Sequence, residues 1–255
     1  MRVLPILFNS EMVRAILDGR KTVTRRCVKF KYSNTEMKMK TDKYGTRLIE
    51  IQKDVEGETY GKNSDGSTWH KLRGYIEPNP PYEPGDILYV RETWNYGYIE
   101  TSDIPESSET WFESVRPDGE CGEYIKALSR YFYKADEDAS GKEVDMIWRP
   151  SIHMPKEAAR IWLRVTDVQV ERLQDIDDKQ AIKEGFEGER CHCGGTAYAC
   201  TDCYNSGWIE PPFVGFMYTW NSTIKKSDLD RYGWDANPWV WVIEFERCEK
   251  PEEEK

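Results

Sequence analysis

The stretch Tyr82-Glu-Pro-Gly-Asp-Ile-Leu-Tyr-Val-Arg-Glu-Thr-Trp94 places a Pro-Gly turn directly before what we interpret as an alternating apolar strand. This combination is typical of a strand in a core sheet. Between two β-rich runs, Thr166-Asp167 predicts a hairpin or a bend. The predicted strands, besides the one after the Pro-Gly turn, cover residues 3–8, 131–135, 161–165, 168–173 and 239–245.

Helices are predicted to be few and short. Asn9 or Ser10 suits a helix N-cap, and the apolar spacing that starts at Val13 is helical up to Gly19. After this helix, we expect residues 22–26 to be extended and exposed on at least one face, since they are rich in Thr, Val and Arg. Further short helices are predicted at residues 177–184 and 213–225.

Many short strands with few helices predict the α+β class, as a partly open mixed β-barrel. We expect one domain over residues 1–248. It contains polar insertions at about 33–80 and 95–130 and a cysteine-rich loop at 187–210, and a disordered charged tail follows at 249–255.

The composition of the 255-residue chain is that of a globular protein, with 38% hydrophobic and 13% aromatic residues. No apolar run approaches the length that crosses a bilayer, and the N-terminus lacks a signal-peptide pattern. We therefore expect a soluble, cytoplasmic protein with no membrane partner.

The charge is unevenly distributed. The net formal charge of −10 argues against a generic basic nucleic-acid binder, yet residues 1–40 hold ten Lys or Arg against three Asp or Glu. This basic pole suits a small nucleic-acid contact or a pocket for an anionic small molecule; a merely solvated basic segment is the alternative.

Four of the seven cysteines, Cys191, Cys193, Cys200 and Cys203, form a C-x-C pair and a C-x-x-C pair within thirteen residues. Two close thiol pairs beside glycines predict a tetrahedral zinc site, and ligation by four thiolates makes that zinc structural. Because C-x-C is tighter than the usual C-x-x-C, His192 is an alternative ligand to Cys191 or Cys193. Unligated reduced thiols are the other alternative.

A possible catalytic site for amide hydrolysis is the segment Ile16-Leu-Asp-Gly-Arg-Lys-Thr-Val-Thr-Arg-Arg26. A lysine whose pKa is lowered by burial or by neighbouring cations can take the proton of a threonine hydroxyl, which then attacks an amide carbonyl. Lys21 and Thr24 are the candidates, with Arg26 as the group that holds an oxyanion or a phosphate. If the segment is extended, Lys21 lies on the opposite face from Thr24 unless a local turn brings them together. Contact with phosphate or solvent is the alternative role.

This segment, the Pro84-Gly-Asp86 turn and the run Trp241-Val-Ile-Glu-Phe245 together resemble the ASCH domain, a PUA-like barrel. With Val90-Arg-Glu-Thr-Trp94 and Trp148-Arg-Pro-Ser-Ile-His-Met-Pro155 added, the chain is most similar to ASCH-like proteins encoded by bacteriophages and prophages. These motifs span most of the chain outside the insertions.

The resemblance implies an RNA-binding or modified-base-binding role. One ASCH branch hydrolyses N4-acetylcytidine, which implies Lys21 and Thr24 as catalytic residues and Glu184 as the matching carboxylate by position. Another branch is associated with RNA cleavage, which we consider a weaker parallel. The insertions and the cysteine loop depart from the hydrolase branch.

Further candidates for nucleic-acid or nucleoside binding are Arg20, Arg25, Arg26, Arg91, Glu92, Trp94 and His153. An Arg/Glu pair beside an indole can hydrogen-bond and stack a base, or it can form a salt bridge over a packed Trp. Glu92 is an alternative to Glu184 for proton transfer, and His153 is an acid, a base or a structural histidine.

The leading interpretation is a cleft between the first helix exit and Arg91–Trp94 that binds a base in RNA, DNA or a free nucleoside, with amide hydrolysis as a possible activity. The alternative is a non-catalytic phage protein that binds a host protein through its acidic surface and insertions.

Overall fold

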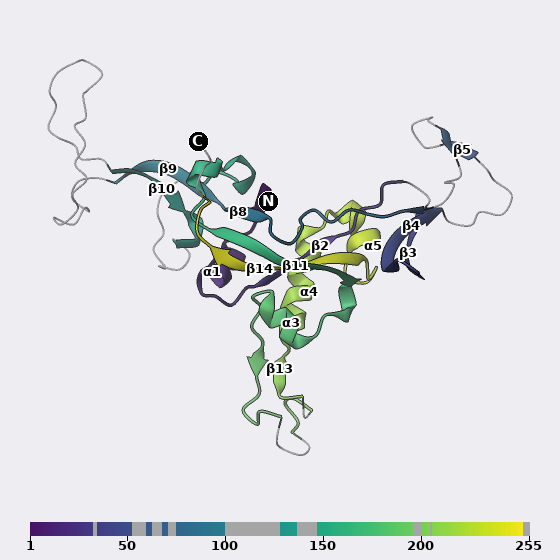
Figure 1. The fold of residues 1–255 in the computed structure, drawn as a ribbon. Helices are drawn as coiled ribbons and strands as arrows, with labels where there is room; N and C mark the ends of the chain where they lie inside the picture. Colours follow the sequence, from purple (N-terminus) through teal and green to yellow (C-terminus); the bar gives the residue numbers. More distant parts are fainter. Residues whose placement is uncertain are drawn as a thin grey trace. The chain divides into compact units, whose positions relative to one another are not determined.

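The computed structural model describes residues 1–32, 35–52, 60–62, 68–70, 75–99, 128–136, 147–195, 200–204 and 206–251 (Figure 1). The predicted insertions at 33–80 and 95–130 lie partly outside these residues, as does the end of the predicted tail. The chain divides into two compact units. Unit 1 comprises Met1–Arg20, Ile87–Arg164 and Arg247–Lys255, and unit 2 comprises Lys21–Asp86 and Val165–Glu246.

Unit 1 is built around the strand that the Pro-Gly turn predicted, β8 (Ile87–Arg91). It pairs in parallel with β1 (Val3–Leu7) and antiparallel with the first three residues of β11 (Trp162–Arg172). All but the last residue of β8 are buried, so the expected alternation was wrong: both faces of the strand are covered, and its sequence is continuously apolar. Unit 1 also contains α1 (Ser10–Leu17), β9 (Trp94–Ile99), β10 (Leu128–Tyr133), η2 (Ser151–His153) and η3 (Lys156–Ala158).

The first helix begins and ends as the sequence predicts. The side chain of Asn9 accepts a hydrogen bond of 2.8 Å from the amide of Met12, so Asn9 is the N-cap. Gly19 follows the helix with φ +75°, a conformation that glycine adopts without steric cost.

Unit 2 contains β14 (Trp239–Cys248) up to Glu246 and β2 (Val23–Cys27), which pair antiparallel. Strand β14 lies between β2 and β11 (Figure 1). The other elements of unit 2 are β3 (Thr35–Asp42), β4 (Gly45–Gln52), β5 (Tyr60–Lys62), β6 (Thr68–His70), β7 (Tyr75–Ile76), η4 (Leu173–Asp175), α3 (Asp178–Lys183), β12 (Glu189–Arg190), β13 (Trp208–Glu210), α4 (Pro212–Thr223), η5 (Lys226–Asp228) and α5 (Leu229–Tyr232).

The two faces of β14 pack against different groups of residues. Val240 and Val242 belong to an apolar cluster with Phe216 and Trp220 of α4. On the other face, the half-buried Trp239 and Trp241 pack against a second cluster, formed by Val28, Met37 and Leu48. The strict alternation of side chains along a strand therefore gives β14 a helix-covered face and a face that carries two tryptophans.

The α+β class with mostly strands and a few short helices is confirmed. Within the described residues the sheets do not close into a barrel, so barrel closure stays a prediction. A second local prediction was wrong. Trp162–Arg172 is a single strand without a hairpin at Thr166-Asp167; the two polar residues there mark the point at which the apolar positions change face, from Leu163 and Val165 to Val168 and Val170. The region predicted as the first insertion contains the sheet β3-β4-β7, which its polar composition did not indicate.

Candidate functional site

The predicted catalytic segment forms β2, and its pairing with β14 fixes which way each side chain points. Thr24 lies opposite Ile243, and Arg26 lies opposite Trp241. Val23 packs into the cluster below α4, and the guanidinium of Arg25 lies 5.9 Å from the ring centroid of Phe216. Arg25 therefore belongs to the helix-covered face, whereas Thr24 and Arg26 belong to the face that carries the tryptophans.

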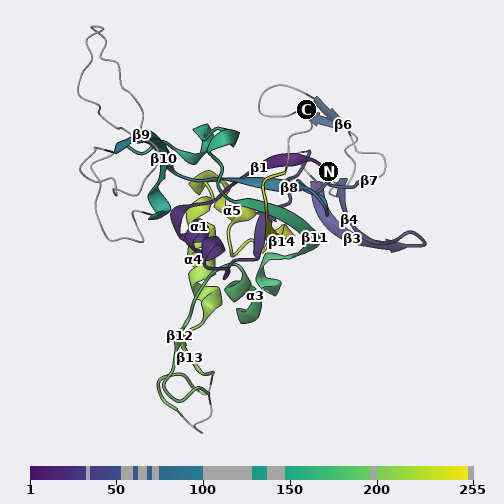
Figure 2. The same cartoon turned by 60° about the vertical axis from the view of Figure 1, so that its left-hand side comes forward.

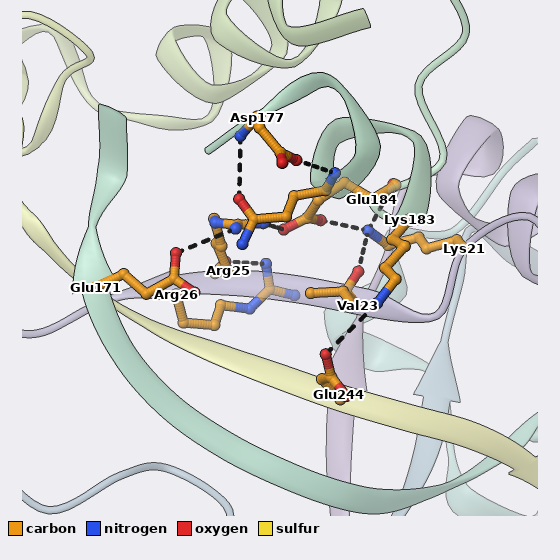
Figure 3. Close-up of polar contacts among 10 residues, drawn as sticks. Lys21, Val23, Arg25, Arg26, Glu171, Asp177, Lys183, Glu184 and Glu244 are labelled. Carbon is orange, nitrogen blue, oxygen red and sulfur yellow. Dashed lines mark hydrogen bonds and ion pairs between the residues drawn. The ribbon is translucent and has the colours of Figure 1, made fainter. Parts of the chain in front are cut away.

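On the helix-covered face, Lys21, Arg25 and Glu184 form an ion-pair cluster (Figure 3). The ammonium of Lys21 lies 2.6 Å from one carboxylate oxygen of Glu184, and Arg25 Nη1 lies 3.2 Å from the other. Lys21 Nζ also donates to the carbonyls of Val23 and Glu184, both at 2.8 Å. A second carboxylate, that of Glu171, lies 3.4 Å from Arg25. We call Lys21, Arg25 and Glu184 the Lys21 cluster.

The Lys21 cluster is removed from solvent. The side chains of Lys21 and Arg25 are 0% exposed and that of Glu184 is 2% exposed. Desolvation lowers the pKa of Lys21, and the charge of Glu184 opposes that shift. Because each buried charge has an opposite charge as partner, removing one partner would leave an uncompensated ion in the core.

Glu184 reaches this cluster because it is the C-cap of α3. The N-terminus of α3 is fixed by a capping box, in which the Asp177 side chain accepts from the Gln180 amide and the Gln180 side chain accepts from the Asp177 amide. The backbone also joins the segments directly, since the Thr22 amide donates to the Lys183 carbonyl at 2.8 Å. Helix α3 is thus fixed at both of its ends, and this positions the carboxylate of Glu184.

The three residues predicted as catalytic are therefore only partly brought together. Lys21 and Glu184 are in contact, whereas Thr24 lies on the other face of β2 and is buried. The expectation of an exposed face for residues 22–26 was wrong for Val23, Thr24 and Arg25, which are all buried. Pairing with β14 and coverage by α4 bury them.

Beyond Thr24 on the same face, a pocket of about 510 Å³ opens beside Arg26 and Trp241. Lys29, Lys31 and Tyr82 also line it. We call it the Arg26 pocket. Its remaining wall comes from Cys27, Val28, Glu50, Ile76, Glu77, Pro78, Asn79 and Pro81.

The charges in the Arg26 pocket favour an anion. Lys29 and Lys31 are exposed at its rim. Glu50, the acid most deeply buried there, is already occupied, because its carboxylate accepts from the amides of Lys31 and Tyr32 and from the hydroxyl of Thr35. Glu50 therefore holds the loop that carries the two lysines.

Burial also affects the titratable groups of this wall. Desolvation lowers the pKa of Arg26, and the charges of Tyr82 and Glu184 oppose the shift. Burial raises the pKa of Tyr82, against the effect of Arg26. It raises the pKa of the Cys27 thiol to about 11. Arg26 and Tyr82 are thus partly desolvated neighbours, which strengthens any hydrogen bond that they make to a ligand.

The remaining predicted binding residues lie in unit 1. Arg20 forms an exposed ion pair with Asp18 at 2.9 Å. Glu92 is buried and pairs with Arg160 through contacts of 2.9 and 3.0 Å, and Arg160 also binds Asp136. Burial raises the pKa of Glu92, and Arg160 opposes that shift. Glu92 therefore forms a salt bridge, but its partner is Arg160 and not Arg91, which the salt-bridge alternative had paired with it.

The other three of these residues are arranged differently. Trp94 is only 5% exposed and packs with Tyr131, so its ring is largely covered. Arg91 donates to the carbonyl of Ile152 at 3.3 Å. His153 is exposed in η2. Whether these residues bind a ligand stays a prediction.

The four clustered cysteines lie in the loop between β12 and β13, a two-stranded ribbon that leads into α4 (Figure 2). All four Sγ atoms lie within 4.8 Å of one another. The Cys191–Cys200 and Cys193–Cys203 sulfur separations are 3.7 and 3.3 Å. Zn–S bonds of about 2.3 Å in a tetrahedron place sulfurs about 3.8 Å apart, so the four thiols fit one metal ion.

Backbone turns bring the thiols together. The Cys191 carbonyl accepts from the Gly194 amide, and the Cys193 sulfur accepts from the Gly195 amide. That amide and then the Cys203 thiol lower the pKa of Cys193 to about 6, whereas, against the effect of the Cys193 backbone amide, desolvation and hydrogen bonds with the other three thiols raise the pKa of Cys191 to about 12. Gly207 has φ +81°, and a Cβ there would lie 3.2 Å from the Gly195 nitrogen. His192 is 77% exposed, with Nδ1 at 3.7 Å from the Cys191 sulfur.

Comparisons of the chain with protein-family models, with curated proteins and with solved structures found no match. No helix among the described residues is long and apolar enough to cross a membrane.

Sequence reasoning missed several residues of the site. Tyr82, Lys29, Lys31 and Trp241 line the Arg26 pocket, and Arg160 neutralises Glu92. The signal available for Trp241 was its alternation with Val240 and Val242, which places it on the opposite face of β14 from the helices. Tyr82 gave no such signal, because it precedes the turn that leads into β8.

Proposed function

We propose that this chain is a nucleic-acid-binding module that holds one nucleotide in the Arg26 pocket. The observation that carries the proposal is a pocket of about 510 Å³ in which one arginine and two lysines lie beside a tryptophan and a tyrosine. Bases stack on aromatic rings, and phosphates bind to Lys and Arg. The resemblance to the ASCH domain, which implies a PUA-like fold, points to the same ligand class.

Each residue type has a role in this proposal. The ring of Trp241 or Tyr82 stacks the base. Arg26 donates hydrogen bonds to the base or to its phosphate, and its partial burial strengthens them. Lys29 and Lys31, which are exposed at the rim, attract the phosphates of the neighbouring backbone. The negative net charge elsewhere restricts binding to this part of the surface.

The test is a fluorescence-anisotropy titration of labelled single-stranded RNA and DNA 12-mers against wild type, Arg26→Gln and Arg247→Gln. Arg247→Gln removes the same charge from an exposed site outside the pocket lining. Arg26→Gln should weaken binding about tenfold or more, whereas Arg247→Gln should leave it nearly unchanged. If wild type binds neither oligonucleotide, the proposal fails and binding to a host protein becomes the better account.

Salt dependence sharpens this test. If Arg26 contacts a phosphate, its loss should reduce the slope of log K against log salt by about 0.7, the value for one phosphate contact on a single strand. An unchanged slope with weaker affinity would assign Arg26 to the base instead.

Hydrolysis of an N4-acyl cytosine-type base is a second candidate. The observation that favours it is the lowered pKa of Lys21, which is in contact with Glu184. In this scheme Thr24 attacks the acyl carbonyl and Lys21 takes its hydroxyl proton, which Glu184 passes to the leaving amine; water then hydrolyses the threonine ester. Because Thr24 lies on the other face of β2 from Glu184, the scheme requires a rearrangement of this segment.

Mass spectrometry of acylated cytidines incubated with wild type and with Thr24→Val tests hydrolysis. Valine has the shape of threonine and suits a strand, so the variant removes only the hydroxyl. Loss of the acyl group with wild type alone would support Thr24 as nucleophile. Equal turnover by both proteins, or none by either, would contradict it.

We also propose that the four cysteines bind one structural zinc ion, since four thiolates leave no position open for water. Inductively coupled plasma mass spectrometry of the purified protein should find about one zinc per chain. Cys200→Ser should reduce that content, whereas Cys248→Ser, outside the cluster, should preserve it. Folded wild-type protein without metal would contradict the proposal.

A further inference from the structure

We propose that the ligand is a single strand of at least two nucleotides, and that the second nucleotide occupies a second pocket beside the Arg26 pocket. This inference rests on the proposed function and specifies its ligand. The second pocket, of about 670 Å³, is lined by Phe30, Arg172, Asp230, Arg231 and Trp239, among others. We call it the Trp239 pocket.

The two pockets adjoin one another. Val28 lines both of them, and its amide donates to the Trp239 carbonyl at 2.9 Å, which extends the pairing of β2 with β14. Beyond Val28, Phe30 lines the Trp239 pocket, whereas Lys29 and Lys31 line the Arg26 pocket. The segment that follows β2, residues 28–31, therefore separates the two pockets.

The two pockets follow one another along β14, because each contains a tryptophan from the same face of this strand. Trp239 and Trp241 are two residues apart on one face of β14 and pack against the same apolar cluster. Their Cα atoms are about 6.7 Å apart by strand geometry. Each pocket thus presents one indole from a single rigid strand, a spacing that two successive unstacked nucleotides can span.

The Trp239 pocket has the chemistry of a base site. The guanidinium of Arg231 lies 4.2 Å from the ring centroid of Phe30, and that of Arg172 lies 4.3 Å from that of Trp239. Arg172 is held there by a hydrogen bond of 2.9 Å to the Asn237 carbonyl. Bases stack on aromatic rings and on guanidinium planes such as these.

Charge assigns the two parts of the ligand to different pockets. In the Trp239 pocket, Arg172 and Arg231 are balanced by Glu36 and Asp230, which offers both donors and acceptors to an uncharged base edge. In the Arg26 pocket, three cations face Glu77 and the occupied Glu50. The phosphate that joins the two nucleotides therefore belongs on the side of Lys29 and Lys31, and the second base belongs in the Trp239 pocket.

Isothermal titration calorimetry with a 5′-mononucleotide and with dinucleotides of RNA and DNA tests this inference. The proteins are wild type, Arg231→Gln and Lys226→Gln. Arg231 is exposed, so its loss should not prevent folding, and Lys226→Gln removes the same charge from an exposed site outside the pocket lining. For wild type, we expect a dinucleotide to bind about tenfold more tightly than the mononucleotide. Arg231→Gln should abolish most of that gain and preserve mononucleotide affinity, and Lys226→Gln should change neither.

The outcomes separate this inference from the proposed function. Mononucleotide binding without a gain for either dinucleotide would overturn the two-pocket arrangement alone. A gain that Arg231→Gln does not reduce would also overturn it. Absence of binding by every nucleotide would overturn the proposed function and this inference together.

Discussion

The two faces of β2 carry neighbouring cations in opposite surroundings. Arg25 faces the helices, is 0% exposed at its side chain and is bound by two carboxylates. Arg26, the next residue, lines a solvent-open pocket beside Trp241 and Tyr82. The sequence K-T-V-T-R-R therefore contains two different sets of basic residues, which strand alternation separates.

The difference shows that a basic motif cannot be assigned to binding as a whole. A buried cation that is paired with carboxylates stabilises the fold, because a ligand would have to displace those partners. A partly exposed cation beside aromatic rings has hydrogen-bonding capacity toward a pocket. We therefore expect substitutions on the helix-covered face to change stability and substitutions on the pocket face to change affinity.

The largest expected effect is on stability, from Glu184→Gln. This change leaves Lys21 and Arg25 buried with only the carboxylate of Glu171 near Arg25. We expect the free energy of unfolding to fall by about 3–5 kcal/mol, the usual cost of breaking a buried ion pair. Urea denaturation followed by tryptophan fluorescence measures it.

The matched control is Glu244→Gln. Glu244 lies 3.9 Å from Lys183, and both side chains are well exposed, so its loss should cost less than about 1 kcal/mol. Equal effects from the two variants would show that the Lys21 cluster does not stabilise the fold as its burial indicates.

A second prediction concerns Cys27, which packs against the apolar cluster of Val240, Val242, Phe216 and Trp220 at the edge of the Arg26 pocket. Its pKa of about 11, against an ordinary 9.0, means that roughly 100-fold less thiolate is present at pH 8. Iodoacetamide should therefore alkylate Cys27 about 100-fold more slowly in the folded protein than in concentrated urea, as measured by peptide mass spectrometry. Comparable rates would mean that the helix-covered face of β2 at Cys27 is less desolvated than described.

The same shift gives a pH dependence. Because the folded pKa of Cys27 lies above the unfolded value, its contribution to stability is fully present below pH 9 and is lost as pH rises toward 11. Cys27→Ser should remove this component from the pH profile of unfolding. A wild-type profile without any decline in that range would contradict the assignment.

Local sequence signals predicted much of the fold. The Pro-Gly turn before β8, the Asn9 cap of α1 and the alternation in β14 all appear as expected, because each depends on neighbouring residues alone. Strand β3 was missed, since Met37 and Met39 alternate with lysines inside a polar stretch. Its partner β4 lies directly after it, so a hairpin interpretation of that stretch was available.

The candidate site was less predictable because it joins distant segments. Lys21 and Glu184 are 163 residues apart, and it was the resemblance to the ASCH domain, supported by a short predicted helix, that pointed to Glu184. The Arg26 pocket combines the exit of β2, the turn before β8 and one face of β14. Local sequence patterns do not predict which distant segments come into contact.

The central claim is that Arg25 stabilises the fold whereas the adjacent Arg26 binds the ligand. The most direct test is to measure the affinity of Arg26→Gln and of Arg25→Lys for a single-stranded 12-mer. Lysine retains the positive charge at position 25 but cannot bridge both carboxylates as arginine does, so both variants are first checked for a cooperative unfolding transition. We predict at least about a tenfold loss of affinity for Arg26→Gln and wild-type affinity for Arg25→Lys. Wild-type affinity for Arg26→Gln together with a loss for Arg25→Lys would contradict the account.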